Sequence, residues 1–81
     1  MKNAAPIHSV VQFLENHKWA GSLGIVTDKK RMITENGIDV RYMIAVPIPM
    51  RGTAYIYSMQ SKNEFDYIGL ATLAPRGDDD V

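Results

Sequence analysis

Hydrophobic and polar residues follow two different periods along the chain, a helical one near the N-terminus and a period of two from residue 23 onward. Over residues 6–18 the spacing predicts a helix, because the mostly apolar positions fall on one stripe. The stripe consists of Ile7, Val10, Val11, Leu14 and Lys18. Pro6 suits the first helical position, where no backbone donor is needed, and Gly21 suits a left-handed cap. We expect no other helix.

The period of two predicts short strands separated by polar turns. The expected strands are residues 23–27, 31–35, 38–48, 53–59 and 67–73, with a turn at 28–30. Asn36 followed by Gly37 is the preferred pair for a two-residue type I′ turn, because both central residues of that turn need a positive φ. The sequence therefore predicts a tight hairpin at this point.

The third expected strand has the clearest alternation of the chain. One face carries Ile38, Val40, Tyr42, Ile44, Val46 and Ile48, and the other carries Asp39, Arg41, Met43, Ala45 and Pro47. The first face should contact the helix. The expected fold class is therefore α+β, with one N-terminal helix packed on a twisted antiparallel meander of about five strands, in two layers. Residues 1–75 would form this single domain and residues 76–81 a flexible acidic tail.

Two prolines interrupt the apolar stretch at the end of the third strand. Pro47 and Pro49 remove two backbone donors from one edge of the strand, so no regular ladder is expected there. Either the strand leaves the sheet and turns through residues 49–52, or this irregular segment forms the rim of a site that presents Met50 and Arg51.

Composition limits the environment and the class of partner. The chain has no cysteine, which leaves neither a disulfide framework nor a thiolate metal site and fits a reducing compartment. Polar residues interrupt the N-terminal apolar positions, so neither a signal peptide nor a membrane span is expected, and we predict a cytoplasmic protein. Nine basic and nine acidic residues balance to a net charge of zero, which does not favour nucleic acid as a partner.

No catalytic or cofactor signature occurs in the chain, and we predict neither an enzyme nor a metal or cofactor site. His8 and His17 would lie on opposite faces of the expected helix, which excludes a shared metal. Two carboxylate pairs flank expected turns without a pocket that would raise a pKa. These pairs are Glu35 with Asp39 and Glu64 with Asp66.

The best indication of function is the face of the expected sheet that lies opposite the helix, because it is unusually apolar for a surface exposed to solvent. Its tentative interface residues are Met43, Ala45, Pro47, Tyr55, Tyr57 and Met59. Tyrosine and methionine are enriched at interfaces. The first hypothesis is thus a small regulator-like or inhibitor-like binding module, of the kind found among phage accessory proteins, which forms a homodimer or higher homo-oligomer and occupies a protein or small-ligand partner. If the strand were shifted by a bulge, however, the two tyrosines would belong to the core.

A second hypothesis is a nucleotide-binding or anion-binding protein with its site at a dimer groove. The basic residues near the turn at 28–30 and on the neighbouring strands would hold the anion, and a tyrosine ring would stack on a base. The tentative ligand-binding residues are Lys30, Arg31, Arg41, Arg51 and Tyr55.

Overall fold

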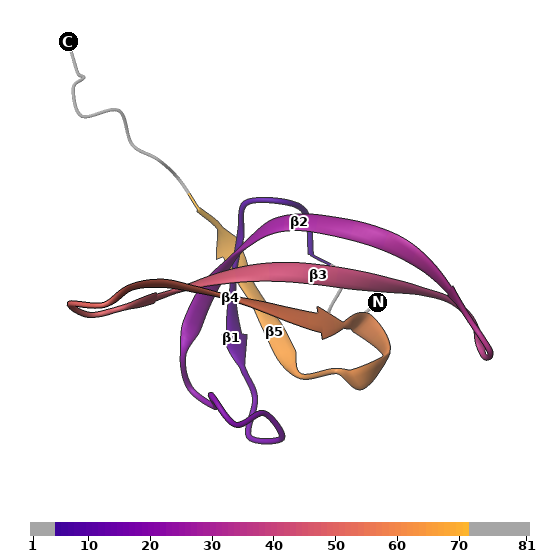
Figure 1. Ribbon diagram of the computed structural model, residues 1–81, viewed down its shortest axis with the longest axis horizontal. Coiled ribbons are helices and arrows are strands. Elements are labelled where there is room, and N and C mark those ends of the chain that lie inside the picture. The colour runs from indigo at the N-terminus through magenta and orange to yellow at the C-terminus, as the bar shows by residue number, and fades with distance from the viewer. Residues whose placement is uncertain (1–4, 72–81) are drawn as a thin grey trace, which may run out of the picture.

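The computed structural model describes residues 5–71 and shows a single curved antiparallel sheet (Figure 1). The order of the strands in the sheet is β4-β3-β2-β1-β5. The strands are β1 (Ser9–Phe13), β2 (Leu23–Thr34), β3 (Gly37–Ile48), β4 (Gly52–Met59) and β5 (Phe65–Leu70). Between β4 and β5, the 3₁₀ turn η1 (Gln60–Lys62) is the only helical element among the described residues. The α+β prediction is therefore wrong, and the expected acidic tail lies outside the described residues.

The expected N-terminal helix is replaced by β1 and a loop. His8 has a φ of 75°, which is incompatible with a continuing helix. Val10 and Val11 are β-branched and pair with β2 on one side and β5 on the other. The burial of Ser9, Val11 and Phe13 follows a period of two, so the helical stripe is a coincidence of spacing.

After β1 the chain makes a loop that returns to the start of β2. The Phe13 N–H donates to the Ser22 carbonyl at 3.0 Å, and the Gly21 N–H donates to the Phe13 carbonyl at 2.9 Å. Gly21 has a φ of 88°, which suits glycine, although it closes a loop and does not cap a helix.

The turn expected at residues 28–30 is also wrong, because β2 is one continuous strand. A register shift between Val26 and Asp28 marks a bulge at this point. The first part of β2 pairs with β1, with Val10 opposite Ile25, and the rest pairs with β3. β2 thus belongs to both halves of the sheet, and Figure 1 shows β1 and β5 crossing the direction of β3 and β4.

The core lies between β3 and the pair of β1 and β5. Tyr42 of β3 contacts Phe65 of β5 edge to face, with the ring centroids 5.2 Å apart. The buried apolar residues are Ala5, Val11, Phe13, Val26, Tyr42, Ile44, Val46 and Phe65. The inner face of β3 buries three of the six side chains that its alternation indicated, Tyr42, Ile44 and Val46, while Val40 and Ile48 are half-buried and Ile38 is 68% exposed. β1 and β5 cover this face in place of a helix.

The hairpin between β2 and β3 is present with a different turn. Gly37 has a φ of 111°, whereas Asn36 is not among the described residues with positive φ. The predicted type I′ turn is therefore wrong. The pairing of Thr34 with Gly37 fits a type I turn followed by a glycine with positive φ.

The prolines do not separate β3 from its neighbour β4. Pro47 lies opposite Thr53 and Ile48 opposite Gly52, so the register continues to the turn. β2 pairs with β3 only as far as Ala45, and no β2 residue pairs with Pro47 on that side. The ladder expected to be lost along one edge of β3 is thus absent on the β2 side beyond Ala45, whereas the β4 side keeps its register.

Met50 occupies a strained position in the turn between β3 and β4. The Arg51 N–H donates to the Ile48 carbonyl at 3.0 Å, and Met50 has a φ of 63°. With Pro49 before it, this is the third position of a type II-like turn, which favours glycine or asparagine. The Met50 side chain is fully exposed and gains nothing from packing.

Met50→Gly is therefore expected to raise the free energy of unfolding by about 0.5–1 kcal/mol, because relief of the left-handed strain exceeds the added entropy of the unfolded chain. Urea unfolding followed by circular dichroism measures the change. Met50→Val is the control and should destabilise the protein, because a β-branched residue tolerates positive φ poorly. A lower stability of the glycine variant would contradict this account of the turn.

Candidate functional site

The two sides of β3 and β4 differ in what covers them. Residues directly opposite each other on paired strands share a face of the sheet. Met43 lies opposite Tyr57, and Ala45 lies opposite both Tyr55 and Ile25. These residues lie on the side away from the core, which we call the outer face. It comprises Leu23, Ile25, Met43, Ala45, Pro47, Tyr55 and Tyr57.

Large apolar side chains on the outer face are open to solvent. Tyr55 is 64% exposed, Tyr57 55% and Leu23 51%. Since Tyr55 and Tyr57 are exposed on β4, the alternative that places them in the core is wrong. A contiguous apolar area of this kind on a small domain is typical of an interaction surface.

The apolar end of the outer face is hollowed where β2 turns from β3 toward β1. The hollow has a volume of about 160 Å³ and is lined by Val10, Leu23, Gly24, Ile25 and Pro47. Pro47 adds a rigid wall without a backbone donor. Of the two readings of the proline segment, the structure shows the turn toward β4, although β3 stays in the sheet as far as Ile48, and Met50 and Arg51 lie in that turn and do not line the hollow.

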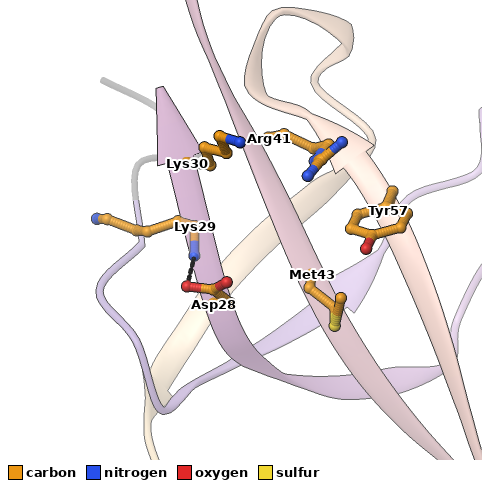
Figure 2. A pocket seen from close by; sticks show the side chains of 6 residues that line it. All are labelled: Asp28, Lys29, Lys30, Arg41, Met43 and Tyr57. Atoms are coloured by element: carbon orange, nitrogen blue, oxygen red, sulfur yellow. Dashed lines mark hydrogen bonds between the residues drawn. The ribbon is translucent and has the colours of Figure 1, made fainter. Parts of the chain in front are cut away.

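The other end of the outer face is basic. Lys30 of β2 lies directly opposite Arg41 of β3, and Arg41 in turn lies opposite Met59 of β4. The Arg41 guanidinium carbon lies 4.4 Å from the centroid of the Tyr57 ring, within the range of a cation–π contact. Figure 2 shows these side chains around a shallow hollow of about 30 Å³. It is lined by Asp28, Lys29, Lys30, Arg41, Met43 and Tyr57.

The structure brings together only part of the predicted ligand set. Lys30 and Arg41 are neighbours, and Tyr55 lies on the same face two residues from Tyr57. Arg31 follows Lys30 in the strand and so faces the opposite side. Arg51 lies in the turn between β3 and β4.

Sequence reasoning missed Asp28 and the apolar residues that β1 and β2 contribute. The sequence predicts a turn at Asp28, whereas the bulge in β2 places it opposite Met43. The sequence predicts a strand that contains Leu23 and Ile25 but does not indicate its neighbours in the sheet. The signal for these residues in the sequence is that Leu23 and Ile25 alternate with Gly24. Only the pairing of β2 with β3 shows that the two side chains lie on the outer face.

The residues weighed as catalytic candidates have structural partners. His17 stacks on Phe13 with 4.3 Å between ring centroids, and its Nδ1 accepts the Trp19 N–H. Asp39 accepts hydrogen bonds from the Ser61 hydroxyl and N–H, and the hydroxyl bond is the main cause that lowers the pKa of this carboxyl. Glu64 accepts the Ser58 hydroxyl at 2.7 Å. Among residues 5–71, no group of three or more histidine and acidic side chains is placed to hold a metal ion.

Comparisons with known protein families, with curated proteins and with solved structures find no match to this chain. Within the part of the chain that the structure describes, no helix is long and apolar enough to span a bilayer.

Proposed function

We propose that this protein is a non-enzymatic binding module that self-associates through its outer face and acts by occupying a partner. The observation that carries the proposal is the group of exposed apolar side chains on β2, β3 and β4, in which Tyr55 and Tyr57 are the largest. Tyrosine contributes contact area at a low entropic cost, and its hydroxyl tolerates both water and a partner. A cytoplasmic location remains part of the proposal.

A second copy of the chain is the partner that this surface fits best. In a two-fold interface the same patch serves both subunits, so a flat apolar sheet face can pair with itself. Ala45 lies between Ile25 and Tyr55 at the middle of the face, where its small side chain lets two sheets approach closely.

The exposed area supports this choice. The two tyrosines alone expose roughly 200 Å² of side chain, given their exposed fractions of 64% and 55%. Leu23, Ile25 and Pro47 extend the patch toward the several hundred Å² per partner that a specific interface buries. The module would thus be a homodimer whose remaining surfaces are free to contact another protein or a small ligand.

Tyr57→Glu tests the interface. The charge is expected to convert the dimer to a folded monomer, because removing a carboxylate from water at an interface costs several kcal/mol, which pairing with the neighbouring Arg41 does not fully offset. Sedimentation over a concentration series should give about twice the chain mass of 9.1 kDa for the natural protein and the monomer mass for the variant.

Ile33→Glu is the matched control. Ile33 is 91% exposed on β2, in the hairpin arm beyond the outer face, so this variant should still form the dimer. A natural protein that sediments as a monomer at all concentrations would contradict self-association. Unfolding of the Tyr57 variant, seen by circular dichroism, would instead place this ring in a structural role.

A further inference from the structure

The basic end of the outer face holds two positive charges that no carboxylate of residues 5–71 neutralises by an ion pair. Lys30 and Arg41 are directly opposite on paired strands, and like charges in this arrangement destabilise a sheet. The ammonium of the neighbouring Lys29 lies on the other face, where it donates to the Ala5 carbonyl at 3.1 Å and lies 5.8 Å from the centroid of the Tyr42 ring. An anion bound between Lys30 and Arg41 would relieve their repulsion.

Arg41 is already held in an orientation that suits anion recognition. Its guanidinium lies over the Tyr57 ring at 4.4 Å, and Figure 2 shows it between Lys30 and Tyr57. Stacking restricts the plane of the guanidinium. Its N–H groups have no hydrogen-bond acceptor among the described residues. A fixed planar fork of donors matches the oxygens of a phosphate group, so little ordering entropy is lost on binding.

We infer that Lys30 and Arg41 bind the phosphate of a small phosphomonoester. Two adjacent cations match its charge of about −1.5 to −2 at neutral pH better than they match a single carboxylate. The hollow of about 30 Å³ is too small for more than part of the anionic group, so the rest of the ligand must lie on the surface outside it.

An exposed aromatic ring lies on the same face as this phosphate position. Tyr55 follows Tyr57 by two residues on the outer face and is 64% exposed. Tyr57 is already covered by Arg41, whereas Tyr55 has no ring or cation contact among the described residues. A base can stack on such a ring while its phosphate contacts Arg41, which assigns the ligand to the nucleoside monophosphates.

The negative charge of Asp28 would repel a bound anion, so removing this charge tests whether the ligand is negatively charged. Its carboxylate lines the same hollow and accepts the Lys29 N–H at 2.9 Å. Removing its charge while keeping the acceptor oxygen should strengthen binding of a phosphate, whereas loss of a purely structural contact would not. Asp28→Asn is therefore expected to lower the Kd for adenosine 5′-monophosphate.

Isothermal titration calorimetry of the full chain with three probes tests the site. Adenosine 5′-monophosphate should bind more tightly than inorganic phosphate, and adenosine should show no binding. Arg41→Gln should weaken binding of the nucleotide about tenfold or more, since a hydrogen bond to a charged group is lost. Arg51→Gln removes the same type of charge in the turn beyond the site and should leave the Kd unchanged.

Tyr55 also belongs to the surface proposed for self-association, so a second copy and a nucleotide would compete for it, and the titrations are made at a concentration at which the protein sediments as a monomer. No binding of nucleotide or phosphate by the monomeric natural protein would overturn the site. Equal losses of affinity for the nucleotide in Arg41→Gln and Arg51→Gln would overturn the site as well, since they would indicate a general attraction between the anion and the positive charges of the protein. Equal affinity for phosphate and nucleotide would overturn the role of Tyr55 and assign the site to free phosphate.

Discussion

Phe65→Ala is expected to lower the free energy of unfolding by about 3–5 kcal/mol, a large part of the stability of so small a domain. Phe65 is completely buried, lies opposite Phe13 in the pairing of β5 with β1, and contacts Tyr42 of β3 edge to face. Its ring therefore joins the two halves of the sheet. Urea unfolding followed by tryptophan fluorescence and circular dichroism would measure the loss.

The control for this variant is Ile68→Ala on the same strand. Ile68 is 55% exposed, so its truncation should cost much less than that of Phe65. If both variants unfold at the same urea concentration as the natural protein, β5 does not cover the core as described.

Gly24→Ala is expected to destabilise the protein by about 1–3 kcal/mol through overpacking. A Cβ at this position would lie 2.5 Å from the Ile44 Cγ2 and 3.1 Å from the Ala45 carbonyl oxygen. Ile44 is fully buried, so it has little room to move aside, and the carbonyl belongs to the backbone of β3. The strand β2 would have to shift away from β3, and thermal unfolding should show a lower Tm.

Gly69→Ala is a matched control for this substitution. Gly69 also lies in a strand, and an added Cβ would meet no atom within 4 Å. Alanine there should be neutral or slightly stabilising, since it reduces the entropy of the unfolded chain. Equal losses of stability at the two glycines would mean that the close approach of β2 to β3 is not the cause.

The sequence predicts the local parts of this fold better than the non-local ones. The alternation along β3 identifies Tyr42, Ile44 and Val46 as buried, because they continue the face opposite to Asp39 and Arg41. Near the N-terminus, Val10 and Val11 fit a helical stripe and a strand equally well. The decision between the two depends on pairing with β2 and β5, which lie far along the chain.

A buried polar residue also obscured the first strand. Ser9 is fully buried, so the alternation of β1 does not appear as apolar residues in the sequence. Its hydroxyl donates to the Pro6 carbonyl at 2.6 Å, which satisfies the buried group locally. Such a bond depends on the turn at residues 6–8 and cannot be read from residue types alone.

The candidate site also contains residues that local alternation predicts and residues whose position depends on the pairing of strands. Met43, Ala45, Tyr55 and Tyr57 fall on one side by simple alternation within β3 and β4. The placement of Asp28 depends instead on the bulge in β2, because one extra residue reverses which face the next side chains occupy. The grouping of Lys30 with Arg41, and the separation of Arg31 from them, follow from this bulge.

The position of β1 between β2 and β5 also bears on the order of folding. β2, β3 and β4 follow one another in the chain and can pair after closing short loops, whereas pairing of Phe13 with Phe65 closes most of the described chain into one large loop. Contacts between distant segments form slowly. The meander can therefore assemble first while the inner face with Tyr42 and Ile44 is still uncovered. The rate at which β5 docks would then set how long a newly made chain is exposed to aggregation.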